Sequence, residues 1–184
     1  MSKGKTILAK ERFKLTIERL CHELIEEYED FSNTCIIGVQ ERGVLLADRI
    51  LKRLQHLSPK TKFEYGKLDI TFYRDDFRTR EEPIKASSTE INFLIEAKRV
   101  ILIDDVLYTG RTIQAALAAL QDFGRPAQVE LLSLVDRRFN RHLPIRPDYT
   151  GLTVDSLDEA YVKVEWENID GQDRILLFSA KRNN

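Results

Sequence analysis

Residues 100–112 read Val-Ile-Leu-Ile-Asp-Asp-Val-Leu-Tyr-Thr-Gly-Arg-Thr, and this stretch decides the fold class. Its first four residues are apolar without alternation, which is typical of a parallel strand that is covered on both faces. From Thr109 onward a helix can begin, because Ile113, Leu117 and Leu120 repeat on one helical face. The stretch therefore predicts a central strand, a polar turn with Thr109 as the N-cap, and a helix.

The polar turn of this unit carries two kinds of binding group. Backbone N–H groups at the start of a helix have no intrahelical partner, and together with the helix dipole they form an anion site. Gly110 lets a phosphate approach the backbone, and the hydroxyl groups of Thr109 and Thr112 add donors. Asp104 and Asp105, at the carboxyl end of the strand, can accept hydrogen bonds from vicinal hydroxyl groups or face a hydrated Mg²⁺. The unit predicts a site for a phosphate and a ribose.

The order of strand, two acids, short apolar stretch and Thr-Gly-Arg-Thr resembles the phosphoribosyl pyrophosphate (PRPP) motif of the type I phosphoribosyltransferases. The resemblance implies an enzyme that uses PRPP and Mg²⁺, with the metal near Asp104 and Asp105 through ribose hydroxyls or water. It also implies substrate contacts along the rest of the motif, at Val106, Leu107, Tyr108, Thr109, Gly110, Arg111 and Thr112. A P-loop is excluded because no Gly-x-x-x-x-Gly-Lys-Ser/Thr occurs, and the isolated Gly110 excludes a dinucleotide fingerprint. The alternative is a buried strand that ends in a solvated acidic turn.

A second polar turn follows another buried strand, predicted over residues 34–39, and precedes a helix predicted over residues 44–54. The turn consists of Gln40, Glu41, Arg42 and Gly43. Because the carboxyl ends of parallel strands meet at one edge of a sheet, this turn should lie beside the PRPP motif. Arg42 can contact a diphosphate, and Gly43 permits an unusual backbone. The position matches the pyrophosphate loop of the type I phosphoribosyltransferases, although the turn alone would also fit a plain strand-to-helix connection.

Four blocks of the chain resemble the PyrR family, whose members combine pyrimidine-operon attenuation with uracil phosphoribosyltransferase activity. They are Asp-Ile-Thr-Phe-Tyr-Arg-Asp-Asp at 69–76, Val-Leu-Tyr-Thr-Gly-Arg-Thr at 106–112, Leu-Val-Asp-Arg at 134–137, and Leu-Pro-Ile-Arg-Pro-Asp-Tyr-Thr-Gly at 143–151. The resemblance implies a flexible β-ribbon lid over about residues 69–92, with Tyr73 and Arg74 at the substrate. It also implies a small hood subdomain over about residues 136–165, with Arg137 at the substrate.

The same resemblance assigns catalytic roles to Arg74, Asp104, Asp105 and Arg42. The two arginines would offset the charge on the departing diphosphate, and the two carboxylates would hold the ribose. The lid would exclude water, because hydrolysis of PRPP is the competing reaction. For Arg74 the alternative is a solvated charge on a loop.

The first functional hypothesis is Mg²⁺-dependent transfer of the phosphoribosyl group of PRPP to uracil, which gives UMP and diphosphate. Tyr108 stands where hypoxanthine-type relatives carry an Asp, and the paired acids differ from the single Asp of dedicated uracil enzymes. Both features favour the PyrR type. Residues 152–156 read Leu-Thr-Val-Asp-Ser, which departs from the Asn-Ile-Pro-Thr-Ser of the PyrR hood that contacts uracil. A phosphoribosyltransferase for hypoxanthine or xanthine is therefore an open alternative.

A second hypothesis is an RNA-binding attenuator that senses UMP or UTP and has weak catalysis. In the PyrR family the RNA face is the basic concave surface of a dimer, so the expected partners are PRPP, a pyrimidine base and a second copy of the chain in a homodimer or higher oligomer. Four arginines could neutralise phosphates, at Arg137, Arg138, Arg141 and Arg146. RNA binding is nevertheless doubtful, because these arginines fit carboxylate pairs equally well and five acids crowd the first predicted helix and its end: Glu18, Glu26, Glu27, Glu29 and Asp30.

The rest of the chain alternates strands and helices. Apolar residues have helical spacing over residues 10–28, a half-buried strand is predicted over 63–74, and a buried strand over 129–135. This order predicts one α/β domain over residues 1–184, with a doubly wound, mostly parallel sheet of the type I phosphoribosyltransferase kind. Two short strands in the last part of the chain are expected near 161–164 and 175–179.

Composition narrows the function classes further. The 184 residues include 29 basic and 30 acidic ones, so a formal net charge of −1 gives no overall attraction to nucleic acid or to an anionic membrane. Cys21 and Cys35 lie in apolar surroundings and are expected to be core thiols in a reducing compartment. Neither a leader segment nor a long apolar run is visible, so a soluble cytoplasmic protein is expected, without membrane contact.

Overall fold

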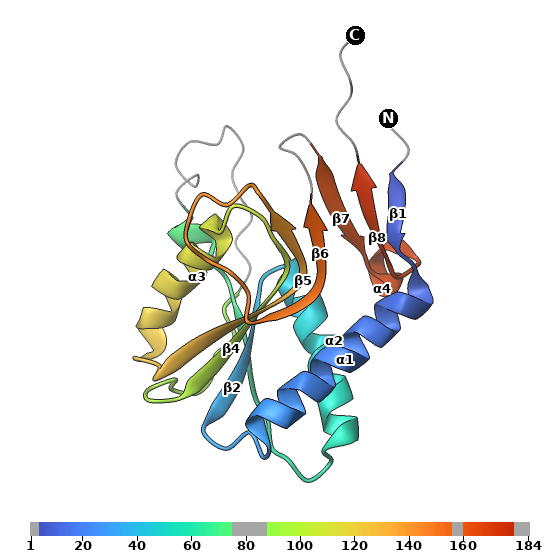
Figure 1. Ribbon diagram of the computed structural model, residues 1–184. Coiled ribbons are helices and arrows are strands. Elements are labelled where there is room, and N and C mark those ends of the chain that lie inside the picture. Colours follow the sequence, from blue (N-terminus) through green and yellow to red (C-terminus); the bar gives the residue numbers. More distant parts are fainter. Residues whose placement is uncertain (1–3, 75–87, 156–159, 179–184) are drawn as a thin grey trace.

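The structure is a computed structural model, which describes residues 4–74, 88–155 and 160–178. Within these residues the main sheet has five parallel strands in the order β3-β2-β4-β5-β6 (Figure 1). The predicted parallel sheet is thus confirmed, with the opening stretch of the sequence at its centre. The strands are β2 (Thr34–Val39), β3 (Glu64–Leu68), β4 (Arg99–Leu107), β5 (Gln128–Arg138) and β6 (Tyr149–Asp155).

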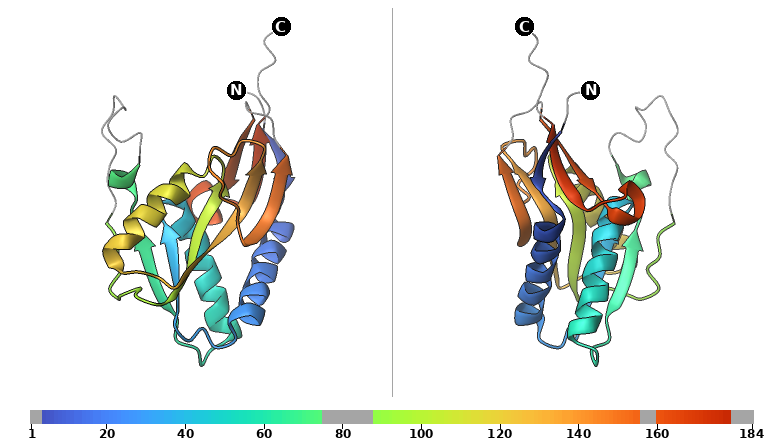
Figure 2. Two further views of the ribbon diagram at one scale, coloured as in Figure 1. Left: turned by 60° about the vertical axis from the view of Figure 1, so that its left-hand side comes forward. Right: turned by 90° about the vertical axis from the view of Figure 1, so that its right-hand side faces the viewer.

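Helices cover both faces of this sheet. Helices α1 (Lys10–Tyr28) and α2 (Arg42–Leu57) lie on one face, and α3 (Arg111–Leu120) lies on the other (Figures 1 and 2). Successive residues of β4 alternate between the two layers, because Ile101 is buried in the core beneath α1 and α2, whereas Leu102 is buried in the core beneath α3. Residues 100–103 of β4 are therefore all apolar, as the sequence predicts for a strand covered on both faces.

Helix α1 has the predicted bounds and buries one face, which consists of Phe13, Ile17, Leu20, Cys21, Leu24 and Tyr28. Among the described helices, none has both the length and the apolar composition that crossing a bilayer requires.

Cys21 and Cys35 are free and buried, as expected. Burial raises the pKa of each thiol to about 12, so both remain protonated, inert core residues.

A three-stranded antiparallel sheet forms a hood beside the carboxyl ends of the main strands (Figure 1). Its elements are β1 (Lys5–Leu8), β7 (Tyr161–Glu165), α4 (Glu167–Asp170) and β8 (Arg174–Phe178). The hood differs from the range 136–165 that the sequence predicts. Within that range β6 is a strand of the main sheet, because it pairs in parallel with β5, while β1 comes from the far end of the chain to pair with β8.

The chain leaves the main sheet earlier than predicted after β3. The expected strand over residues 63–74 ends at Leu68, because the Asp69 carboxylate accepts hydrogen bonds from the backbone N–H (2.8 Å) and the hydroxyl (2.6 Å) of Thr71. A short 3₁₀ helix, η1 (Thr71–Tyr73), follows. Of the lid expected over residues 69–92, the part from 75 to 87 lies outside the described residues, and Glu90 pairs antiparallel with Lys67.

The hood is fixed to the helical layer by one tryptophan. Trp166 is fully buried, and its ring meets Phe13 of α1 edge to face, with centroids 5.4 Å apart. The guanidinium of Arg49 on α2 lies 5.0 Å from the Trp166 ring and donates a 2.6 Å hydrogen bond to Asp173. Because these contacts join three elements, the position of the hood depends on the packing of Trp166.

We therefore expect Trp166→Ala to lower the free energy of unfolding by about 3–5 kcal/mol, through lost apolar burial and the resulting cavity. Urea unfolding monitored by far-ultraviolet circular dichroism would measure the change. The control is Leu15→Ala, because the Leu15 side chain on α1 is 66% exposed and its loss should change stability by less than about 0.5 kcal/mol. Equal unfolding midpoints for the two variants would contradict this role of Trp166.

Candidate active site

The two adjacent carboxylates of the central strand β4 lie near the carboxyl end of that strand. Asp104 and Asp105 are each only 7% exposed, and the Asp105 backbone N–H donates to Asp104 Oδ1 at 3.1 Å. The strand does not end at the acids, as the sequence suggests, but continues to Leu107, because β5 extends the pairing until Asp136 lies opposite Leu107. The carboxylates are therefore held by a regular strand rather than by a flexible turn.

Burial raises the pKa of both carboxyl groups above their usual range, and for Asp104 the neighbouring charge of Asp105 raises it further. Two cations act in the opposite direction: Arg74 lowers the pKa of Asp104, and Arg42 lowers the pKa of Asp105. Because the ionised form of a buried carboxylate pair is poorly solvated, the pair favours the binding of a proton, a hydrogen-bond donor or a cation.

The amino end of α2 approaches β4 closely at Gly43. A Cβ atom on this residue would lie 2.5 Å from the carbonyl oxygen of Ile103 and 3.0 Å from Cα of Asp104. Gly43 lies inside α2 and has no positive φ, so the sequence-based idea of an unusual backbone at this residue is wrong. Glycine is needed because α2 and β4 touch there. The preceding peptide bond, between Gln40 and Glu41, is cis.

A cavity of about 370 Å³ lies between these elements. It brings together eight of the predicted site residues: Gln40, Glu41, Arg42, Arg74, Asp104, Asp105, Val106 and Thr112. The remaining lining comes from Asp69, Ile70 and Thr71, for which the sequence analysis predicted no contact. The Gln40 side chain also donates a 2.6 Å hydrogen bond to the carbonyl of Ser88, where the described chain resumes after residues 75–87. The cavity thus joins the ends of β2, β3 and β4.

The turn that precedes α3 begins the helix later than predicted. Gly110, with φ of +92°, occupies the N-cap position in place of Thr109, and the helix starts at Arg111. The hydroxyl of Thr109 accepts a 3.4 Å hydrogen bond from the Arg111 backbone N–H. Only Gly110 suits this left-handed conformation without strain. Thr112, in the first turn of α3, is the residue of this segment that lines the cavity.

A second cavity, of about 330 Å³, lies between the main sheet and the hood. Its lining consists of Arg42, Asp105, Val106, Tyr108, Arg137, Tyr161, Val162, Lys163 and Val164. The Arg137 guanidinium lies 3.9 Å from the centroid of the Tyr108 ring and donates a 2.6 Å hydrogen bond to the carbonyl of Ala160. Arg42, Asp105 and Val106 line both cavities, which therefore share one wall.

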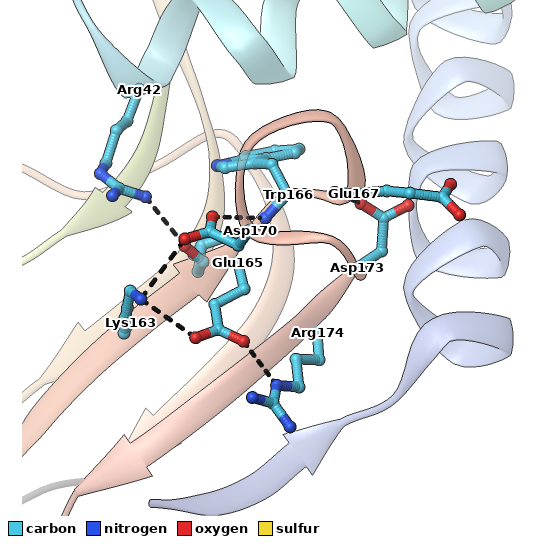
Figure 3. A network of polar contacts seen from close by, with 9 residues as sticks. Arg42, Lys163, Glu165, Trp166, Glu167, Asp170, Asp173 and Arg174 are labelled. Carbon is cyan, nitrogen blue, oxygen red and sulfur yellow. Dashed lines mark hydrogen bonds and ion pairs between the residues drawn. The ribbon is translucent and has the colours of Figure 1, made fainter.

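A polar network in the hood stands behind this wall (Figure 3). Arg42 donates a 2.9 Å hydrogen bond to the carbonyl of Val164, so one of its guanidinium nitrogens is directed at the hood. Lys163 pairs with Glu165 at 3.0 Å and with Asp170 at 3.4 Å. Arg174 pairs with the other oxygen of Glu165 at 2.6 Å. The network holds β7 and β8 in register at the cavity.

Several predicted contacts lie away from both cavities. The Leu107 side chain is buried in the core beneath α3, and its N–H donates to the hydroxyl of Ser133 at 3.1 Å. The Tyr73 hydroxyl donates to the carboxylate of Asp122, which lies in the short 3₁₀ helix (Gln121–Phe123) that follows α3. Four other predicted residues are close in sequence to residues that line the first cavity but do not line it themselves: Gly43, Thr109, Gly110 and Arg111.

The wall expected from residues 152–156 is also different. Residues 152–155 belong to β6, which pairs with β5 and does not line the second cavity, and residue 156 lies outside the described part of the chain. Tyr161, Val162, Lys163 and Val164 of β7 supply the wall instead.

A family model described as the phosphoribosyl transferase domain matches residues 3–168 of the chain. The chain belongs to the phosphoribosyltransferase family. Within it, the chain is 40% identical over 177 residues to the bifunctional protein PyrR of Caldicellulosiruptor bescii, covering 96% of each chain. It is 38% identical over 182 residues to PyrR of Bacillus cereus, covering 97% of this chain and 99% of the relative. These relatives place it in the PyrR branch of the family, in agreement with the sequence motifs.

Solved structures of phosphoribosyltransferases share the fold. A hypoxanthine phosphoribosyltransferase from Staphylococcus aureus superposes with a TM-score of 0.70 at 20% identity, covering 97% of this chain and 93% of that one. A hypoxanthine-guanine phosphoribosyltransferase from Bacillus anthracis superposes with a TM-score of 0.71 at 16% identity, covering 97% and 99%. At these identities the likeness extends to the architecture alone.

The buried carboxylates predict a pH dependence of stability. A raised pKa means that the folded protein holds protons which the unfolded chain releases, so the pair costs stability as pH rises from about 4 towards 8. We expect Asp104→Asn to raise the melting temperature at pH 8 and to change it little at pH 5. Thermal unfolding in buffers that contain a chelator would measure this difference.

The matched control is Asp155→Asn. The Arg138 guanidinium lowers the pKa of Asp155, so this pair contributes only at pH values where the carboxylate is ionised. Its removal should therefore lower the melting temperature slightly at pH 8, the opposite sign. A stabilisation of Asp104→Asn that is equal at both pH values would argue against ionisation as the cause.

Proposed function

We propose that the protein transfers the phosphoribosyl group of PRPP to uracil and releases UMP and diphosphate. The observation that carries the proposal is the shared wall of the two cavities. Asp105 and Val106 separate a polar cavity lined by arginines and carboxylates from a second cavity closed by Tyr108 and the hood. A reaction that joins a phosphorylated sugar to a flat base needs two such sites in contact.

Each substrate group has a suitable partner in this arrangement. Asp104 and Asp105 accept hydrogen bonds from the ribose hydroxyls, and the start of α3 with Thr112 receives the 5′-phosphate. The bond from C1 of the ribose to the diphosphate breaks with positive charge on the sugar and negative charge on the leaving group. The carboxylates stabilise the first charge, and Arg42 and Arg74 stabilise the second.

The donor set also fits a divalent cation that binds with the substrate. In residues 4–74, 88–155 and 160–178, no cluster of three or more metal-binding side chains occurs. Mg²⁺ commonly binds through one or two carboxylates, water and substrate phosphates, and Asp104 and Asp105 could hold it in that way. The metal would supply charge neutralisation at the diphosphate.

Uracil is the favoured base for two reasons. The residue before Thr109 is Tyr108, not the acid of hypoxanthine-type relatives, and Tyr108 lines the second cavity with the Arg137 guanidinium over its ring. The relatives named bifunctional protein PyrR, at 40% and 38% identity, support the same choice, because the motifs of this chain resemble the PyrR family. The proposal includes a single domain over residues 1–184, a lid over about residues 69–92, and assembly into a homodimer or a higher homo-oligomer.

The reaction can be tested with PRPP, Mg²⁺ and each of uracil, hypoxanthine, guanine and orotate. We expect kcat/KM for uracil to exceed that for each other base by at least about a hundredfold. Chromatographic separation of the nucleotides would measure this ratio. Faster conversion of hypoxanthine would favour the alternative enzyme.

A carboxylate variant tests the assigned site. Asp105→Asn should lower kcat/KM for PRPP by about 10–100-fold, because charge-assisted hydrogen bonds to the ribose are lost. Asp155→Asn is the control, since the Asp155 side chain is exposed at the end of β6 and pairs with Arg138. If no base is converted and Asp105→Asn leaves PRPP affinity unchanged, the enzymatic proposal is wrong.

A second candidate, an RNA-binding attenuator, follows from the resemblance to the PyrR family, to which the bifunctional relatives belong. Two arginines that could contact RNA, Arg19 on α1 and Arg138 at the end of β5, have partners within the chain. Arg19 donates to the carbonyls of Thr150 and Gly151 at 2.9 and 2.8 Å, and Arg138 forms two 2.7 Å hydrogen bonds with Asp155. These pairs must compete with phosphate for the same guanidinium groups.

We therefore predict that pyrimidine leader RNA binds with a Kd in the micromolar range or weaker at physiological salt, roughly the strength of non-specific binding. A filter-binding series at increasing salt would measure the affinity and its salt slope, with an unrelated RNA of equal length as the control. Nanomolar, sequence-dependent binding at physiological salt would show that the attenuator function is present.

A further inference from the structure

The connection between β5 and β6, residues 139–148, packs against the turn that precedes α3 and is called here the bracing loop. Strand β5 anchors its far end, because Asp148 accepts a hydrogen bond from the Leu131 N–H and donates one to the Leu131 carbonyl, both at 2.8 Å. Near the other end, Asp136 of β5 forms an ion pair with Arg141. The loop is thus held at both ends by the same rigid strand.

Two successive carbonyl groups of the turn accept hydrogen bonds from the bracing loop. The Arg141 guanidinium donates to the carbonyl of Tyr108 through one nitrogen and to the Asp136 carboxylate through another. The next residue, His142, donates its backbone N–H to the carbonyl of Thr109 at 3.0 Å. The planar guanidinium suits this bridging role, because its donors have a fixed geometry.

These contacts set the direction of the neighbouring N–H groups. A peptide unit is planar and trans, so the N–H that follows a carbonyl points to the opposite side. A donor fixed on the carbonyl of Tyr108 therefore orients the N–H of Thr109, and one on the carbonyl of Thr109 orients the N–H of Gly110. A donor on the carbonyl also polarises its peptide unit and strengthens the hydrogen bond that its N–H can donate.

Apolar contacts support the same arrangement. The position of a Cβ on Gly110 would be 3.4 Å from side-chain atoms of both Leu143 and Ile145, so the bracing loop lies directly against the turn. The side chain of Arg141 is 19% exposed and that of Asp136 13% exposed, which shelters their ion pair from solvent. This burial distinguishes Arg141 from Arg138, whose side chain is 54% exposed.

We propose that Arg141, held by Asp136, is a positioning residue that orients the turn of residues 108–110 for the 5′-phosphate of PRPP. The inference rests on the proposed function. It adds Arg141 to the residues that support PRPP binding, acting from the side of the turn that faces away from the substrate. Arg141 contributes to affinity for the phosphate end of PRPP and leaves the diphosphate end unaffected, because Arg42 and Arg74 lie on other elements.

The test compares Arg141→Ala, Arg141→Lys and Asp136→Asn with Arg138→Ala as the matched control. We expect Arg141→Ala to raise KM for PRPP and Kd for ribose 5-phosphate about tenfold, the size expected for one lost charge-assisted hydrogen bond. The kcat should stay within about twofold, and Kd for inorganic diphosphate, measured by calorimetry, should not change. Arg141→Lys and Asp136→Asn should give smaller increases in the same two constants.

Several results would decide against the proposal. The proposal would be overturned if Arg141→Ala bound ribose 5-phosphate as tightly as Arg138→Ala does. It would also be overturned if Arg141→Ala weakened the binding of diphosphate and of ribose 5-phosphate equally. If Arg141→Ala is poorly folded by circular dichroism, Asp136→Asn tests the same role, because it weakens the ion pair that holds Arg141 while the Arg141 side chain remains. Wild-type protein that binds neither PRPP nor ribose 5-phosphate would overturn the proposed function itself, and the inference with it.

Discussion

The burial of two adjacent carboxylates at the end of β4 is the constraint on which the site depends. Water stabilises the charges of Asp104 and Asp105 poorly there, because each residue is largely buried, and cationic groups from two other elements approach them, Arg42 from α2 and Arg74 from the end of η1. The approach of α2 is possible because residue 43 has no side chain. The resulting pocket is electrostatically incomplete without hydrogen-bond donors or a cation, which a sugar diphosphate with its metal would supply.

Local signals account for what the sequence predicted well. The bounds of α1 and β2 agree residue for residue with the prediction, because an amphipathic repeat and an unbroken apolar run are both decided by neighbouring residues. The first cavity was largely predictable for a related reason. In a parallel sheet all strand ends meet at one edge, so residues after β2 and within β4 had to converge.

The errors have non-local causes. Strand β1 pairs with β8 from the opposite end of the chain, and no pattern within either segment specifies that partner. For the same reason the wall of the second cavity could not be assigned to β7, since Tyr161 and Lys163 reach it only after the hood has folded. The ends of β3 and β4 depended on single contacts, the carboxylate of Asp69 in one case and continued pairing with β5 in the other.

The shared wall between the cavities has a thermodynamic consequence. Arg42 lines both cavities and is bonded to the hood through the Val164 carbonyl, so a diphosphate that draws this guanidinium away also changes the wall of the base cavity. Linkage requires that a base which alters the position of Arg42 changes the affinity for the diphosphate by the same factor. Under the proposed function the two substrates would therefore not bind independently, because Arg42 would couple the affinity of one cavity to the occupancy of the other.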